Sequence, residues 1–128
     1  MKVDFNNGKI YMLICNRTNK IYIGSTTESI KIRLQKHYKY YNEYLEGKRK
    51  YTCSSSKILE KGKTYIMLLE NYPCKSKAEL YAREEMWLSK FRPICVNKNR
   101  AKCNHIIGYS IYQKSTSIKF INSIEFID

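Results

Sequence analysis

The sequence predicts an α/β fold for residues 1–99. Two runs rich in Ile and Tyr flank a polar turn, and a third run is almost continuously apolar. Two further segments combine helix-capping residues with apolar side chains at helical spacing. The chain has 128 residues, which is enough for one domain with a modest core.

The first predicted element is a β-hairpin between Gly8 and Gly24. Residues 16–20 between its strands are polar and include two Asn, which is typical of a loop longer than two residues. Side chains alternate between the two faces of a strand, so Tyr11 and Tyr22 share one face, side by side or diagonal, if the Ile and Met positions share the other. We expect the two phenols, with Gly24 beside them, to form a polar and approachable patch.

A helix is predicted from about residue 28 to residue 44 or 45. Residues 25–28 supply candidate N-caps and an acid for the first turn. Arg33 and His37 are four residues apart, so their side chains project together. They lie beside the predicted buried stripe, which consists of Ile30, Leu34, Tyr38 and Tyr41.

A basic loop and a short helix precede the third predicted strand. Residues 46–50 are either a solvated loop or a phosphate contact, and the sequence favours neither. Three serines at residues 54–56 are expected to cap a short helix over residues 57–61, which Gly62 ends. The strand at residues 64–70 is nearly apolar throughout, so we expect it to be central in the sheet or covered.

A second long helix is predicted over residues 76–90, opened by a capping box of Ser and, three residues later, Glu. Glu84 falls on its apolar face, and a carboxylate there is unfavourable unless it is paired or binds a cation. Glu84 is therefore either the partner of a basic residue, such as Arg83 or Arg33, or a functional residue. The other residues of that face are Leu80, Trp87, Leu88 and Phe91.

The C-terminal quarter is harder to interpret. Residues 94–97 are expected to close the domain as a short strand or turn. Residues 100–128, an extension of unknown role, alternate apolar clusters with Ser and Thr. Extra strands on the domain, a partner-binding extension and the start of a second module all fit this pattern.

The composition favours a polyanionic partner. The chain has 24 Lys and Arg against 11 Asp and Glu, a net charge of +13, and 12 Tyr. Basic side chains that neutralise phosphates release counterions, and aromatic rings stack on bases, so we expect a nucleic acid. The alternative is a solvated basic surface without a partner.

No apolar run approaches the roughly 18 residues that span a membrane, and no signal peptide is visible. We therefore expect a soluble intracellular protein with no membrane partner, in the cytoplasm, or in the nucleus or a virus factory if the protein is viral. Heavy use of Lys, Asn, Ile and Tyr is typical of an AT-rich genome, such as that of a phage or large DNA virus.

The cysteines indicate free thiols in a reducing compartment. There are five, widely spaced and without a Cys-x-x-Cys pair, which argues against a disulfide framework or zinc ribbon. Burial of these thiols is the simplest interpretation. Cys95, Cys103 and His105 offer three ligands to a metal, but a fourth is missing.

The hairpin resembles the signature of the GIY-YIG nuclease family. The second half of that signature is matched by Tyr22, Ile23 and Gly24, and the first half by residues 9–11, with Lys9 in place of the opening Gly. The resemblance extends over about residues 8–97. The further matches, in order, are Arg33 and His37 one turn apart, Glu84 followed three positions later by Trp87, and Asn97 after that helix.

The resemblance implies an α/β sandwich, a small and mainly antiparallel three-stranded sheet flanked by helices. It also implies a metal-dependent endonuclease that cuts DNA. Glu84 would then bind one Mg²⁺ or Mn²⁺, and Arg33 would clamp the scissile phosphate. Tyr11 is the candidate general base, and Arg33 and His37 supply the cation and proton acceptor that a phenol of ordinary pKa needs.

Two further residues have expected roles at this site. Tyr22 would hold water or phosphate by hydrogen bonding, and Asn97 would fix the geometry. Taken singly, each of the six residues also has an ordinary structural explanation. The alternative function is a nucleic-acid-binding module of the same fold that does not cleave, which Lys9 favours if the lost Gly let the backbone approach DNA. An unrelated basic structural protein is a third and more distant possibility.

Overall fold

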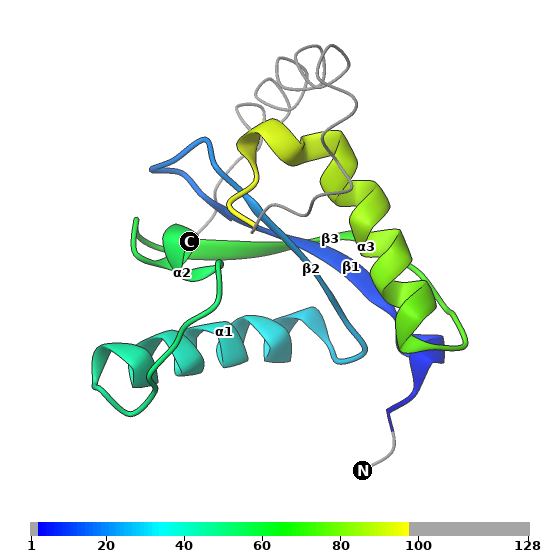
Figure 1. The fold of residues 1–128 in the computed structure, drawn as a ribbon, viewed down its shortest axis with the longest axis horizontal. Coiled ribbons are helices and arrows are strands. Elements are labelled where there is room, and N and C mark those ends of the chain that lie inside the picture. Colours follow the sequence, from blue (N-terminus) through cyan, green and yellow to red (C-terminus); the bar gives the residue numbers. More distant parts are fainter. Residues whose placement is uncertain (1–2, 98–128) are drawn as a thin grey trace.

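The computed structural model describes residues 3–97, which form a three-stranded antiparallel sheet between helices (Figure 1). The strands β1 (Lys9–Cys15), β2 (Tyr22–Thr26) and β3 (Thr64–Asn71) lie in the order β2-β1-β3. This confirms the α/β sandwich. The predicted extension, with Cys103 and His105, lies outside the described residues.

The hairpin forms as predicted and sets the two tyrosines on one face. In its antiparallel register Tyr11 pairs with Gly24, and Leu13 pairs with Tyr22. Because residues two apart share a face, Tyr11 and Tyr22 are diagonal neighbours.

The central strand is β1, so of the two alternatives predicted for residues 64–70, central or covered, the central position is wrong. β3 lies at an edge, and Leu68 on it is 39% exposed. Both faces of β3 are nevertheless partly covered, since Met67 packs against one core cluster and Ile66 against the other. The strand is therefore apolar because side chains pack on both of its faces, and not because it has a hydrogen-bonded strand on each side.

Helices cover the two faces of the sheet. α3 (Lys77–Phe91) packs on the face formed by Ile10, Met12 and Ile14 of β1. α1 (Ile30–Leu45) and the short α2 (Ser56–Leu59) cover the face of Tyr11, Leu13 and Cys15. Side chains from α1 and α2 that complete this second layer are Ile30, Leu34 and Ile58.

The helix caps partly match expectation. α1 is capped by Ser29, whose hydroxyl accepts from the backbone N of Ile32 at 3.2 Å, whereas the predicted caps at residues 25–28 are wrong because β2 extends to Thr26. α3 is capped as predicted: the Ser76 hydroxyl accepts from the backbone N of Glu79 at 3.2 Å. The serine before α2 makes no capping bond with its side chain.

The segment after α3 returns to the hairpin. A 3-10 turn, Arg92–Ile94, is followed by a parallel bridge between Ile21 and Cys95. The backbone N of Val96 donates to the carbonyl of Ile21 at 2.8 Å. Residues 94–97 therefore form the predicted short strand or turn, which brings the last described residues beside β2.

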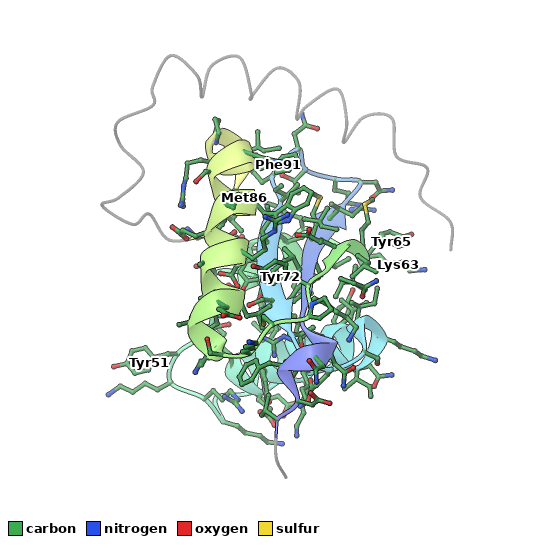
Figure 2. The ribbon with its side chains drawn as sticks, turned by 90° about the vertical axis from the view of Figure 1, so that its right-hand side faces the viewer. Tyr51, Lys63, Tyr65, Tyr72, Met86 and Phe91 are labelled. Carbon is green, nitrogen blue, oxygen red and sulfur yellow. The ribbon has the colours of Figure 1, made fainter. Side chains whose placement is uncertain are left out.

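An aromatic side chain and a cysteine of the described residues are notably exposed. Figure 2 shows Tyr51 standing away from the body on the loop between α1 and α2, and its side chain is 77% exposed. Cys15 and Cys74 are buried free thiols as expected, but Cys53 is exposed. Within the described part of the chain, no helix is long and apolar enough to cross a membrane.

Candidate functional site

Tyr11 is the centre of the site. It lies in the middle of β1 and is completely buried, so the expectation of an approachable pair of phenols is wrong for Tyr11. Its hydroxyl lies 2.7 Å from Nε2 of His37, and Nε of Arg33 donates to the same oxygen at 3.1 Å. The spacing of four residues on α1 presents Arg33 and His37 to one phenol. The prediction that these two side chains project together is therefore confirmed.

Gly24 makes room for this arrangement. It stands opposite Tyr11 in the register, and a Cβ atom at residue 24 would lie 2.5 Å from the Tyr11 hydroxyl. That distance is far below van der Waals contact, so any side chain at residue 24 would displace the phenol.

Lys9 does not disturb the hairpin. It pairs with Thr26 on one side and Asn71 on the other, and its ammonium donates to the carbonyl of Asn7 at 2.8 Å. The close backbone approach at this end of β1 is made by Gly8, where a Cβ atom would lie 2.4 Å from the carbonyl oxygen of Tyr72. The substitution of the motif Gly by Lys9 is therefore accommodated at the start of the strand.

Tyr22 completes an aromatic cluster with Tyr11 and His37. Its ring centroid lies 6.4 Å from that of Tyr11 and 5.5 Å from that of His37, with an edge-on arrangement toward the imidazole. Tyr22 is partly exposed, so it forms the boundary between the buried phenol and solvent.

Burial dominates the protonation of the cluster. It raises the pKa of Tyr11 to about 12, although the charge of Arg33 works in the opposite direction. Burial, followed by the charge of Arg33, lowers the pKa of His37 to about 4. The pKa of Tyr22 is also raised by burial. At neutral pH the two phenols are therefore protonated and His37 is neutral, and Arg33 does not by itself activate Tyr11.

These charge states assign the hydrogen-bond directions. Arg33 donates to the Tyr11 oxygen, so the Tyr11 proton is directed to Nε2 of the neutral His37. The remaining proton of the imidazole is then on Nδ1, which lies 2.9 Å from Oγ of Ser55. Oγ of Ser55 lies 2.6 Å from Sγ of Cys53.

Ser55 is a residue that the sequence did not single out. It is 1% exposed, and its hydroxyl bonds to His37 instead of capping α2. A serine triplet before a helix is typical of a cap, and this local signal concealed the long-range role. The chain of hydrogen bonds ends at Cys53, which is exposed.

Glu84 approaches β2 from the α3 layer. Its Oε1 accepts from the hydroxyl of Ser25 at 2.7 Å, directly after the glycine that faces Tyr11. Burial is the main cause of the raised pKa values of Tyr11 and Tyr22, and the negative charge of Glu84 is a smaller one, so the carboxylate lies within electrostatic reach of both phenols. Ser25 was predicted only as a candidate cap.

The suggestion that Arg83 is the partner of Glu84 is wrong. Arg83 instead forms a bidentate pair with Glu70 at 2.6 and 2.7 Å, and the indole of Trp87 donates to the same carboxylate at 3.0 Å. Arg83, Glu70 and Trp87 therefore form a separate structural network on β3 and α3.

Asn97 holds the outer edge of β2. Its Oδ1 accepts from the backbone N of Ile23 at 3.1 Å, and its Nδ2 donates to the Ile23 carbonyl at 2.7 Å. This pairing imitates a neighbouring strand. It positions the segment that carries Tyr22 and Gly24.

The donors near Glu84 suit a hard cation. A carboxylate and a hydroxyl are oxygen ligands of the kind that Mg²⁺ prefers, and this ion keeps several waters when one or two carboxylates bind it. Within residues 3–97, no group of three or more His, Cys, Asp or Glu is placed to hold a metal ion. Glu84 and Ser25 are thus the described oxygen donors that could contribute to binding such an ion.

Comparison with known proteins assigns the family. The family model of the GIY-YIG catalytic domain matches residues 7–100. No curated protein and no solved structure matches the chain. Domains of this family are nucleases of the endonuclease type that act on DNA. The match spans most of the chain and every residue of the site described above, so the protein belongs to the GIY-YIG nuclease family.

Proposed function

We propose that this protein is a metal-dependent DNA endonuclease that hydrolyses phosphodiester bonds. The observation that carries the proposal is the pair of hydrogen bonds joining the Tyr11 hydroxyl to His37 and Arg33, with Glu84 held across β2. Such a site combines a proton acceptor, a fixed cation and a hard oxygen ligand.

Tyr11 is the proposed general base. The Tyr11 proton moves to Nε2 of His37, and the phenolate then takes a proton from the attacking water. The oxygen of that water forms a bond to phosphorus, the bond from phosphorus to the leaving oxygen breaks, and the leaving oxygen takes a proton from solvent. The expected products carry a 5′-phosphate and a 3′-hydroxyl.

The free protein opposes the first of these proton transfers. Burial raises the pKa of Tyr11 to about 12 and lowers that of His37 to about 4, so both shifts add to the free-energy cost of this transfer. Attraction between phenolate and imidazolium reduces this cost. A cation held by Glu84 would reduce this cost further, because Glu84 lies within electrostatic reach of Tyr11 and a positive charge there would favour the phenolate. We therefore expect Tyr11 to act as a base only when the DNA substrate and the cation are bound.

Arg33 is the proposed phosphate clamp. Its Nε is engaged with Tyr11, while the residue also lines a surface hollow with Ser25 and Lys36. The guanidinium has five donors in a planar fork, so it can hold the phenol and a phosphate together.

Glu84 would hold the cation, whose chemistry is to neutralise charge that develops on the phosphate. Ser25 orients the Glu84 carboxylate through its hydroxyl. Tyr22, at the solvent boundary, would donate to water or phosphate, and Asn97 keeps β2 in place for both.

The test is a plasmid cleavage assay with Mg²⁺ and with Mn²⁺. We expect wild type to nick or cut the plasmid, and Glu84→Ala to abolish cleavage while DNA binding remains largely intact. Glu46→Ala, which removes an exposed carboxylate paired with Lys48, is the matched control and should cut normally. Cleavage by Glu84→Ala would refute the metal assignment. Wild type that binds DNA and never cuts it would select the non-cleaving binding module.

A further inference from the structure

Two surface hollows lie at opposite ends of β2. The first, which we call the lysine hollow, has a volume of about 540 Å³ and lies between the hairpin turn, α2 and the segment after α3. Its charged lining consists of Lys20, Lys57 and Lys61 against one carboxylate, Glu60. This excess of positive charge suits a phosphate backbone.

The second, which we call the tyrosine hollow, has a volume of about 350 Å³ and lies beside the end of β2 and the start of α1. Its cationic lining consists of Arg33, Lys36 and Lys77, and it also contains Tyr81, which is 45% exposed. Lys36 is paired with Glu28, and Lys77 lies 5.3 Å from the ring centroid of Tyr81. This hollow therefore offers both phosphate donors and a ring on which a base can stack.

Both hollows border the site. Asn97 lines the lysine hollow and also bonds to Ile23 of β2. Ser25 and Arg33 line the tyrosine hollow and bond to Glu84 and Tyr11, respectively. The reacting groups are therefore located between two cationic surfaces.

The distance between the hollows matches a short length of nucleic acid. The five residues of β2 span about 13 Å at roughly 3.3 Å per residue. One strand of a duplex carries one phosphate per 3.4 Å of helix axis, so about three or four nucleotides extend along β2. A strand with its scissile phosphate at Gly24 then has neighbouring phosphates at both ends.

We propose that the polynucleotide strand cut at this site runs along β2, and that Lys20, Lys57 and Lys61 bind its phosphates on one side of the scissile bond. On the other side the strand enters the tyrosine hollow, where Lys77 binds phosphate and Tyr81 stacks on a base. The inference rests on the proposed nuclease function and adds the course of the substrate across the surface.

The test compares two double substitutions that change the net charge equally. Lys57→Glu with Lys61→Glu alters the lysine hollow, whereas Lys31→Glu with Lys39→Glu alters exposed positions of α1 that line neither hollow. Both pairs are made in a Glu84→Gln background, and binding to a fluorescein-labelled DNA duplex is measured by anisotropy over a range of salt concentrations. Thermal unfolding followed by circular dichroism checks that all variants are folded.

We expect the lysine-hollow pair to weaken binding about 10- to 100-fold more than the control pair. The slope of log K against log salt should fall by about 2, because each lost phosphate contact removes about 0.9. If both double variants lost the same DNA affinity, binding would depend only on the net charge of the protein, and the inference would be overturned.

The plasmid assay separates this inference from the proposed function. If wild type cuts and the two pairs bind equally, the proposed nuclease stands and the path along β2 is wrong. If wild type never cuts but the lysine-hollow pair still binds far more weakly, the path is supported for a binding module and the nuclease proposal fails. Tyr81→Ala should weaken binding to single-stranded DNA about 5- to 150-fold, the usual range for one lost base stack, and an unchanged affinity would overturn the stacking role of Tyr81.

Discussion

The two faces of β1 are equally buried but are built from different chemistry. Ile10, Met12 and Ile14 face α3 and form part of a hydrocarbon core. On the other face Tyr11 has a polar network around its hydroxyl, made with Arg33 and His37. One strand thus stabilises the domain on one side and builds the candidate site on the other.

The two faces of β1 tolerate different substitutions. Hydrophobic burial has no direction and scales with area, so the α3 face depends on volume and shape. A buried hydroxyl is unfavourable unless its hydrogen bonds are made, so the Tyr11 face depends on partners within about 3 Å. Substitutions on the α3 face should therefore lower stability, whereas those on the Tyr11 face should mainly lower activity.

The largest expected effect is that of Tyr11→Phe on cleavage. The variant lacks the proposed base, and we expect the cleavage rate to fall about 10²- to 10⁴-fold. Without the hydroxyl, Nε of Arg33 and Nε2 of His37 each lose a hydrogen bond, so the free energy of unfolding should fall by about 1–3 kcal/mol. Single-turnover cleavage and urea unfolding give the two values. Tyr38→Phe, which removes a hydroxyl bonded to the backbone of Thr64, is the control and should cut at the wild-type rate.

Met12→Ala should produce the opposite pattern. Met12 is completely buried on the α3 face, and its truncation should lower the free energy of unfolding by about 2–5 kcal/mol. The cleavage rate per folded molecule should change less than about threefold, measured where the variant is folded. If fully folded Met12→Ala cleaved DNA as slowly as Tyr11→Phe, the two faces of β1 would not be separate in function.

The pH dependence of stability should report the burial of His37. Its pKa is about 4 in the folded protein and about 6.5 when unfolded, so the unfolded state binds more protons as the pH falls below 6.5. The resulting stability is fully present above that pH and is lost progressively down to about pH 4. Between pH 7 and pH 5, wild type should lose about 2 kcal/mol more than His37→Gln in urea unfolding. If wild type and His37→Gln lost the same free energy of unfolding over this pH range, His37 would not be a buried, neutral imidazole.

The smallest effect is expected for Ser55→Ala, which acts on Tyr11 only through His37. Without the Ser55 hydroxyl, Nδ1 of His37 loses its acceptor and the required tautomer is no longer favoured. Cleavage should slow about 10-fold, with an altered pH–rate profile, because a lost positioning bond is worth about 1–1.5 kcal/mol. Ser54→Ala is the neighbouring control. An unchanged pH–rate profile in Ser55→Ala would mean that the serine is only structural.

Much of the fold was readable from local patterns. Alternation along the hairpin placed Tyr11 and Tyr22 on one face, and the four-residue spacing joined Arg33 with His37. The capping box predicted the start of α3 at the correct residue. These inferences hold because each depends on the periodicity of one element or on the contact between two adjacent strands.

Other features depended on how the elements pack together. The amino-acid sequence by itself determined which residues share a face, but only the tertiary structure decided that Tyr11 is buried, that Ser55 bonds to His37, and that Glu84 receives its hydrogen bond from Ser25. The partners in these two bonds are 18 and 59 residues apart. No local spacing specifies such pairs, because their distances are set by the packing of separate elements, and the resulting burial sets the protonation of the site.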